Sequence, residues 1–458
     1  MKRFFRYFFL FIVVFFLGAY FVVPKFSYEY LGGKEYIAQI NPVMTNSDQP
    51  DIVRIDRDKK KIIRASSLDL YLGVVGDSLL SLPRLGVNYL NIDRFKTDIG
   101  EEFFGIFVDP FKNDSRFLLE SLVELEVKSV GIRVYYSEDF FRSEDFSTLK
   151  SFLDDLMVHG FEPFIVIAQN FEAKRSSDLE PFFERFFAEF YPYAKEFQIG
   201  ETINRMKWGI VQKGDYKRFF DSALSASRKY EDIKLVAPSV IDFEWYYTLY
   251  YLDEIGRENV DILNSLLYVD RRGWPENEQY GFDTIDKIEL MKATDPNKPF
   301  WITEVNWPIS GTDDYKPTSE DEAVSTKVYA DYLVRYMLLG LSTSLVDRVY
   351  WWQLAAKGYG LIDHLNEERY EGFYAYKFLI ETLQDASFVS KKEDRGFIEM
   401  FFEGSGGEEI SVLWCEDECE YLKEHEKQIN KQPNKTYYNV IGEEIDSPKI
   451  GTSPIYIK

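Results

Sequence analysis

The sequence predicts a (β/α)8 barrel, a closed ring of eight parallel strands in which a helix follows each strand. Three observations predict it. Apolar runs of strand length alternate with longer segments whose apolar residues recur every three to four positions. Eight such runs can be counted between residues 103 and 354. No glycine-rich phosphate loop follows the first run, which disfavours the alternative, a doubly wound open sheet.

Each predicted strand is a short apolar run rich in aromatic and β-branched residues. The eight runs occupy residues 103–109, 129–136, 161–169, 196–203, 234–242, 260–269, 299–306 and 347–354. Helical periodicity between them is clearest at residues 115–127, 146–160, 215–230 and 322–341. The alternation of these two patterns assigns residues 101–383 to the barrel.

The regions on either side of the barrel predict β-structure. Residues 35–100 contain short alternating stretches separated by polar turns, typical of an accessory β-rich segment. Residues 384–458 alternate apolar and polar side chains between Gly and Pro turns, which predicts a small C-terminal β-domain. The full prediction is therefore a barrel with flanking β-rich structure.

Residues 1–25 predict a membrane segment. Three basic residues precede an uncharged run over residues 7–23, which is about long enough to span a bilayer and longer than a usual signal-peptide core. The positive-inside rule leaves the N-terminus in the cytoplasm and the remaining chain outside. We therefore expect an uncleaved transmembrane helix, with a cleaved signal as the alternative, and an extracytoplasmic protein in the periplasm or at the cell surface.

Composition narrows the partners and cofactors. The 458 residues are 45% hydrophobic, enough for a large packed core, and the net charge of −23 repels phosphate backbones, so nucleic acid is not an expected partner. Cys415 and Cys419 suit either a small-loop disulfide or two idle thiols. With the histidines scattered at His159, His364 and His425, no metal or organic cofactor is expected.

Two glutamates end strands of the predicted barrel. Glu304 closes the seventh strand in "WITEVNW", and Glu201 lies near the end of the fourth in "FQIGETIN". Because an unpaired buried carboxylate costs several kcal/mol, each is paired, solvated or used. Active sites of such barrels lie at the carboxyl ends of the strands. Two carboxylates there can hydrolyse a glycosidic bond with retention, one as the nucleophile and the other as acid and then base.

These motifs resemble those of the clan A glycoside hydrolases over roughly residues 100 to 383 and the tail. The resemblance implies that Glu304 is the nucleophile and Glu201 the acid/base. "SVGIRVYY" is similar to the end of the family's strand 2, whose arginine supports the nucleophile, here Arg133. "NSLLYVD" is similar to the end of strand 6, whose tyrosine bonds the nucleophile, here Tyr268; Leu266 stands where the family usually has a histidine.

Tryptophans complete the resemblance. "VYWWQL" resembles strand 8 of the family, whose tryptophan forms the floor of the sugar site, here Trp351 or Trp352. Trp307, just after strand 7, is a further candidate for stacking on a sugar ring. The structural alternative is that these rings fill the core, as aromatic side chains do in large proteins.

Strand 4 departs from the family pattern Ile-Gly-Asn-Glu-Pro-Asn. Laid without a gap on residues 199–204, the pattern retains Asn204 but puts Glu201 at the asparagine and Thr202 at the acid/base. Shifted by one residue, it makes Glu201 the acid, places Gly200 at the asparagine and forfeits Asn204. Threonine cannot protonate a leaving group, and general acid assistance is typically worth about 10² to 10⁴ in rate.

The sequence therefore predicts a membrane-anchored glycoside hydrolase acting on a polysaccharide or oligosaccharide. Glu304 and Glu201 are the predicted catalytic residues, and the predicted substrate-binding residues are Arg133, Asn204, Tyr268, Trp307, Trp351 and Trp352. One alternative is a catalytically impaired glycan-binding barrel, and another is a scaffold in envelope polysaccharide assembly. The structural alternatives for the acids are an ion pair between Glu304 and an arginine of the mouth, and one between Glu201 and Arg205 or Lys207.

Overall fold

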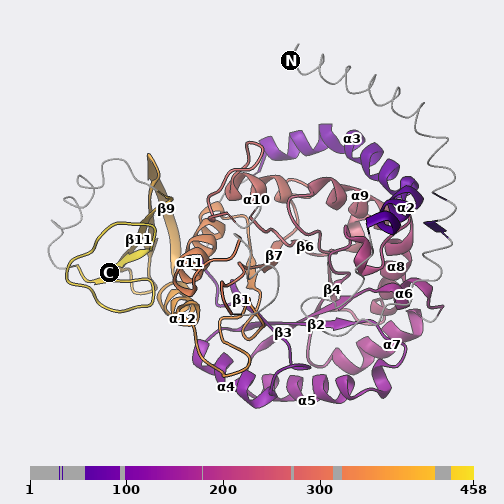
Figure 1. Cartoon of the computed structure of the whole chain (residues 1–458), viewed down its shortest axis with the longest axis horizontal. Coiled ribbons are helices and arrows are strands. Elements are labelled where there is room, and N and C mark those ends of the chain that lie inside the picture. Colours follow the sequence, from indigo (N-terminus) through magenta and orange to yellow (C-terminus); the bar gives the residue numbers. More distant parts are fainter. Residues whose placement is uncertain are drawn as a thin grey trace, which may run out of the picture.

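The computed structural model describes residues 30, 33–34, 57–92, 98–177, 179–269, 273–312, 322–417 and 435–458. The predicted membrane segment, residues 1–25, lies outside this part of the chain. Eight parallel strands form one sheet in the order β5-β4-β3-β2-β1-β8-β7-β6. Parallel bridges from Val236 to Ile262 and from Ile241 to Leu266 connect its two edges. The sheet thereby closes into the predicted barrel, with helices around it (Figure 1).

The barrel strands match the predicted apolar runs. They are β1 (Phe104–Val108), β2 (Ser129–Tyr135), β3 (Glu162–Ala168), β4 (Glu196–Ile199), β5 (Lys234–Val236), β6 (Leu263–Ser265), β7 (Phe300–Val305) and β8 (Arg348–Trp351). Several of them, including β1, β2, β7 and β8, are buried along their whole length. This follows from their place in a parallel sheet, which has the barrel interior on one face and helices on the other.

Helices follow the strands in the order that the barrel requires. They are α4 (Ser115–Leu125), α5 (Glu144–Val158), α6 (Phe171–Arg175), α7 (Leu179–Phe190), α8 (Asp215–Ser227), α9 (Trp245–Ile255), α10 (Thr284–Lys292), α11 (Thr326–Thr343) and α12 (Glu371–Leu383). Short 3-10 turns form η1 (Phe140–Arg142), η2 (Met206–Trp208) and η3 (Arg257–Asn259). Helix α4 begins where Asp114 accepts a hydrogen bond from the Phe117 amide and buries Leu118, Leu122 and Leu125 at helical spacing.

Aromatic side chains fill much of the barrel interior. Phe107, Phe164, Trp301, Tyr350 and Trp352 form one buried cluster with three aliphatic residues. The ring of Tyr350 explains the glycine at position 105 on β1, because a Cβ there would lie 2.5 Å from Tyr350 Cδ1. The interior is thus a packed core rather than a pore.

The accessory segment before the barrel is helical where the structure describes it, so the predicted β-rich structure is wrong for residues 57–90. Helices α2 (Arg57–Ser66) and α3 (Leu68–Leu90) occupy this region. Apolar residues are so frequent in this segment that its sequence matches both the two-residue period of a strand and the 3.6-residue period of a helix. The helical period is the one used: α3 buries Leu70, Val74 and Leu85 against the barrel helices.

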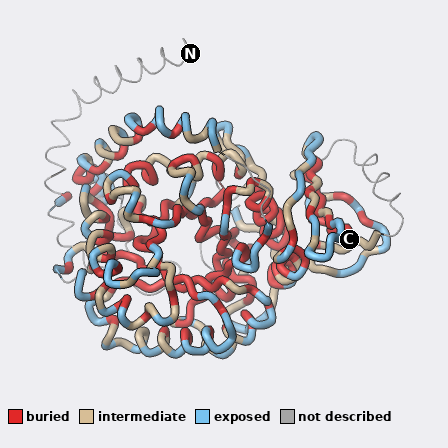
Figure 2. The backbone as a smooth tube through the Cα atoms, turned by 180° about the vertical axis from the view of Figure 1, so that it is seen from behind, coloured by how far each residue is buried: buried red, intermediate tan, exposed pale blue. Residues whose placement is uncertain are grey.

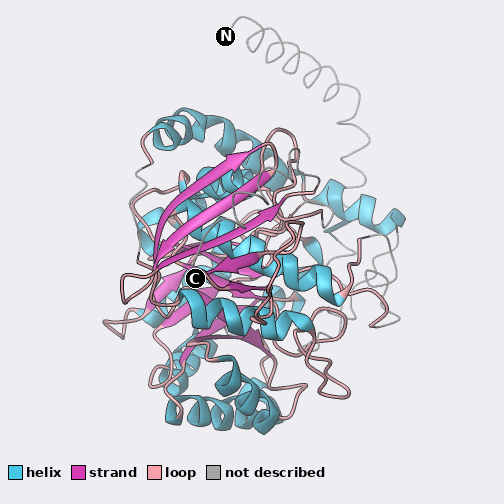
Figure 3. Cartoon of the chain, turned by 90° about the vertical axis from the view of Figure 1, so that its left-hand side faces the viewer, coloured by secondary structure: helices cyan, strands magenta, loops and turns pink. Residues whose placement is uncertain are grey.

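The C-terminal region forms the predicted flanking β-structure (Figures 1 and 3). Five strands make an antiparallel sheet in the order β12-β13-β11-β10-β9, and they are β9 (Ser387–Asp394), β10 (Phe397–Glu403), β11 (Glu409–Cys415), β12 (Tyr437–Tyr438) and β13 (Ile455–Ile457). Cys415 is disulfide-bonded. The other cysteine of the sequence, Cys419, lies outside the described residues.

A buried ion pair of the barrel forms hydrogen bonds with the C-terminal region. Arg335 of α11 is completely buried and pairs with Glu276, which lies in the loop between β6 and α10. The same arginine donates to the carbonyl oxygen of Glu416 at 2.7 Å, and Trp414 Nε1 donates to Glu276 Oε1 at 2.8 Å. The tail is therefore attached through the Trp414 side chain and the Glu416 carbonyl group.

Candidate active site

Glu304 lies near the carboxyl end of β7 between two polar partners. Arg133 of β2 donates from Nη1 to Glu304 Oε2 at 3.3 Å. The Tyr268 hydroxyl, just after β6, donates to Glu304 Oε1 at 2.5 Å. Both predicted partners are thus beside the carboxylate. The glutamate is 9% exposed, and the two donors stabilise its ionised form.

Glu201 is fixed at the end of β4 by the side chain of Gln169. The Gln169 amide accepts from the Glu201 backbone N–H at 2.9 Å and donates to its carbonyl oxygen at 2.7 Å. The carboxylate of Glu201 accepts from Gln198 Nε2 at 2.8 Å and from the Thr202 hydroxyl at 3.3 Å. With an exposure of 2%, this acid is held in one orientation.

One guanidinium group joins the two acids. Arg133 Nη1, which bonds Glu304, also lies 3.7 Å from Glu201 Oε1. The pKa of Glu201 is raised to about 7, mainly by burial and also by the charge of Glu304, while Arg133 lowers it. The structural alternative in which Glu201 pairs with Arg205 is wrong, because Arg205 pairs with Asp242 and Glu244.

The turn after β4 selects which residue faces the site. Gly200 and Thr202 both have positive φ, 97° and 47°, and the Thr202 backbone N–H donates to Ser239 Oγ at 2.9 Å. The Thr202 hydroxyl bonds Glu201 rather than Glu304. Of the two strand 4 residues that the motif comparison leaves open, the structure therefore brings Glu201 to Glu304.

A polar layer below the acids was not predicted. Gln198 of β4, which donates to Glu201, accepts from Asn264 Nδ2 of β6 at 2.7 Å and from the Thr303 hydroxyl of β7 at 3.2 Å. Thr303 also donates to Asn264 Oδ1 at 2.5 Å. The signal in the sequence is a polar residue inside an otherwise apolar strand, one to four positions before the site residue that follows it. This network orients Gln198 toward the carboxylate.

Two aromatic rings lie beside the shared arginine. The Trp352 ring has the Arg133 guanidinium carbon 4.0 Å from its centroid. Trp208 in η2 stacks on Tyr135 at the end of β2, with ring centroids 5.6 Å apart and planes 11° from parallel. Trp208 was not among the predicted site residues. Its sequence signal is its position shortly after Glu201 in the loop that follows β4.

Trp307 and Trp351 are corrections to the prediction. Both have 0% exposure and stack on each other at 5.9 Å between centroids. Their indole N–H groups donate to the Gly273 carbonyl at 2.8 Å and to the Tyr329 hydroxyl at 2.6 Å. A ring without exposed surface presents no face to a sugar, so these two tryptophans are core residues behind strands 7 and 8 and Trp352 remains the candidate of the pair.

Asn204 is the third correction. Its amide donates to the Ile241 carbonyl at 3.0 Å and to Glu244 Oε2 at 2.7 Å, and it accepts from the Ile241 backbone N–H at 3.1 Å. Both amide hydrogens are used within the protein, so Asn204 joins the loops after β4 and β5 instead of reaching the carboxylates.

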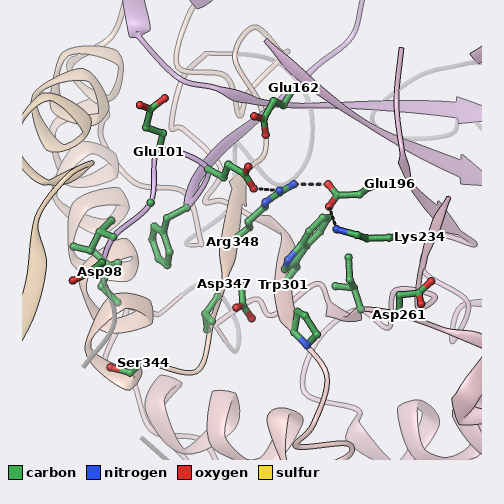
Figure 4. A pocket seen from close by; sticks show the side chains of 18 residues that line it. Asp98, Glu101, Glu162, Glu196, Lys234, Asp261, Trp301, Ser344, Asp347 and Arg348 are labelled. Carbon is green, nitrogen blue, oxygen red and sulfur yellow. Dashed lines mark hydrogen bonds and ion pairs between the residues drawn. The ribbon is translucent and has the colours of Figure 1, made fainter. Parts of the chain in front are cut away.

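The opposite end of the barrel has a cavity of about 690 Å³ (Figure 4). Arg348 lies between Glu196 and Glu102 there, and Lys234 is 3.6 Å from Glu196. These charges pair with one another at the amino-terminal ends of the strands, where side chains of such barrels serve stability. Among the described residues, no group of three His, Cys, Asp or Glu side chains has the arrangement of a metal site.

Fold and site together define a class: a (β/α)8 barrel with two facing glutamates at the carboxyl ends of strands 4 and 7. Solved structures share the fold. A family 39 glycoside hydrolase from the gut symbiont Bacteroides cellulosilyticus WH2 aligns with a TM-score of 0.59 and 14% identity, over 78% of this chain and 81% of its own. A GH30 endoxylanase from Clostridium papyrosolvens C71 aligns with a TM-score of 0.55 and 10% identity, over 80% and 97%.

A GH51 arabinofuranosidase from Xanthomonas axonopodis pv. citri aligns with a TM-score of 0.52 and 12% identity, over 79% of this chain and 97% of its own. No protein-family model and no curated protein sequence matches the chain. At such identities the likeness concerns the fold: this chain shares the barrel fold of these glycoside hydrolases.

Proposed function

We propose that this protein is a retaining glycoside hydrolase that acts on a polysaccharide or oligosaccharide. The single observation that carries the proposal is the shared contact of Arg133 Nη1 with Glu304 at 3.3 Å and Glu201 at 3.7 Å. Two carboxylates on strands 4 and 7, joined by one cation and differing in environment, provide a nucleophile and a proton donor. The aromatic rings nearest to the acids are Trp352 and Trp208, which are 6% and 4% exposed and would contact a bound sugar at their exposed edges.

In this mechanism Glu304 attacks the anomeric carbon while protonated Glu201 donates its proton to the departing glycosidic oxygen. The C–O bond to the leaving group breaks and a glycosyl ester forms on Glu304. Glu201, now ionised, then removes a proton from water, which attacks the anomeric carbon and releases Glu304. The raised pKa of Glu201, about 7, allows it to act as an acid and then as a base near neutrality.

The location of the protein is part of the proposal. Residues 1–25 would anchor the chain in a membrane, with the barrel on the extracytoplasmic side and a cell-surface or environmental glycan as substrate. The disulfide at Cys415 supports an extracytoplasmic location, because disulfides persist in oxidising compartments.

The test compares Glu304→Gln and Glu201→Gln with the control Glu367→Gln, an exposed glutamate in the loop after β8. Glu304→Gln should abolish hydrolysis of activated aryl glycosides. Glu201→Gln should lower the rate on unactivated glycosides by about 10² to 10⁴ and have a much smaller effect on activated ones, which need no acid for departure. Added azide should rescue it by giving a glycosyl azide of retained configuration. Equal activity of all three variants contradicts the proposal.

A second function, glycan binding without turnover, is favoured by one observation. The Glu201 carboxylate is 2% exposed and accepts hydrogen bonds from Gln198 and Thr202. Such an acid, held inside the barrel, is poorly placed to reach a leaving group. In that case the unaltered protein binds oligosaccharides in calorimetry but hydrolyses neither activated nor unactivated glycosides, and Glu304→Gln leaves turnover at its background value.

A further inference from the structure

Helix α3 is apolar on two opposite faces. Its inward face packs on the barrel helices: Leu85 contacts Leu249 and Ala293, Ser78 donates to the Tyr246 carbonyl at 3.1 Å, and Asn88 donates to the Ala293 carbonyl at 2.9 Å. These contacts fix α3 along the outer side of α9 and α10 (Figure 1). A helix tied to the barrel in this way is part of the folded domain.

The outward face of α3 carries an apolar stripe. Exposed positions recur along this helix (Figure 2). Its exposed residues recur at helical spacing and include Leu72, Val75, Leu79, Leu80, Val87 and Leu90. Leu80 and Leu90 are 81% and 83% exposed. From Leu72 to Leu90 the only charged residues are Asp77 and Arg84, and Arg84 pairs with Asp253 of α9 at 3.2 Å. A helix that is apolar all round normally has both faces covered.

The charge next to this stripe indicates what covers it. The chain carries a net charge of −23, yet α2, which directly precedes α3, exposes Lys60, Lys61 and Arg64, of which Lys61 pairs with Asp58 at 3.2 Å. Basic side chains beside an apolar helical face are the features that bind a helix to a bilayer with anionic headgroups. The sequence also predicts a membrane segment at residues 7–23, earlier in the same chain.

We propose that α3 lies flat on the membrane, with its outward stripe in the headgroup and upper acyl region and the basic side chains of α2 on anionic lipids. The helix is 23 residues long, enough to cross a bilayer, but its inward contacts with α9 and α10 keep it on the surface. The side wall of the barrel, rather than either end, then faces the lipid.

The test places an environment-sensitive fluorophore on a cysteine at Leu80→Cys in the full chain. The matched control is Val158→Cys at the end of α5, on the opposite side of the barrel, which is equally exposed at 81%. Each labelled protein is reconstituted in vesicles of phosphatidylcholine and phosphatidylglycerol, with and without lipids that carry a nitroxide near the headgroup. The readout is independent of hydrolysis.

The expected result is a blue shift at position 80 and a loss of its emission when nitroxide lipids are present, with no change at position 158. Equal behaviour of the two positions overturns the proposal, because a tether alone leaves both labels in water. A blue shift at position 80 that grows with protein concentration and resists the nitroxide lipids also overturns it, since a second copy of the chain then covers α3.

Discussion

Arg133 is the residue on which the geometry of the candidate site depends. Its guanidinium contacts both glutamates and lies against the Trp352 ring. When Glu201 is protonated, the Arg133 cation faces one anion, the Glu304 carboxylate. When Glu201 is ionised, Arg133 faces two carboxylates. The protonation state of one acid therefore sets the charge that a bound substrate meets.

The pH dependence of hydrolysis follows from Glu201. Its folded-state pKa is raised to about 7, mainly by burial, and the proposed first step needs the protonated form. We expect kcat/KM to fall as pH rises through about 7, and the Glu201→Gln variant to lose this alkaline limb on activated substrates. The measurement is a pH profile of kcat/KM. An unaltered protein whose activity is level from pH 6 to about 9 would contradict the assignment.

Sequence reasoning named Glu304 because it ends an apolar strand, and Arg133 and Tyr268 because their motifs resemble those of the clan A glycoside hydrolases; the structure places the three side chains together. Sequence reasoning did not settle the strand 4 register, since the choice between Glu201 and Thr202 depends on a turn in which Thr202 has a φ of 47°. A β-branched residue rarely adopts that conformation, so no local rule places the turn there. Trp307 and Trp351 could not be separated from Trp352 either, because burial depends on neighbours such as Tyr329 that are distant in sequence.

At the scale of elements, the barrel strands were predictable because burial on both faces gives them uninterrupted apolar runs. The helices at residues 57–90 were not predictable. Because α3 is apolar on its inward and outward faces, its sequence shows little alternation between apolar and polar residues at helical spacing. The polar layer of Gln198, Asn264 and Thr303 was not predicted either. A single polar residue in a strand does not indicate which polar residues of other strands it will contact.

Packing inside the barrel makes a prediction for β1. Gly105→Ala puts a Cβ 2.5 Å from Tyr350, which is itself enclosed by Phe107, Phe164 and Trp301. We expect overpacking to lower the free energy of unfolding by about 1 to 3 kcal/mol. The measurement is denaturant unfolding of each variant.

The matched control is Gly86→Ala within α3, where a Cβ meets no atom within 4 Å. Replacing glycine inside a helix should raise the free energy of unfolding by about 0.5 to 1 kcal/mol. Destabilisation of similar size at both positions would show that the barrel interior is not tightly packed around Tyr350.

For the whole molecule, the attachment of the C-terminal sheet depends on a buried charge. Arg335→Gln leaves Glu276 without its cation in a buried environment, and we expect a loss of about 3 to 5 kcal/mol in the free energy of unfolding. Arg228→Gln, at an exposed arginine after α8, should change it little. Limited proteolysis should then cut Arg335→Gln between the barrel and the tail. Unchanged stability of this variant would mean that the tail is held by other contacts.

The stripe on α3 has a consequence for how the protein meets its substrate. If that helix rests on lipid, the barrel can rotate about the membrane normal but cannot tumble, and its mouth stays at a constant height. Encounters with a polymer attached to the same surface would then be governed by the number of chains per unit area, while a dissolved oligosaccharide would arrive according to its bulk concentration.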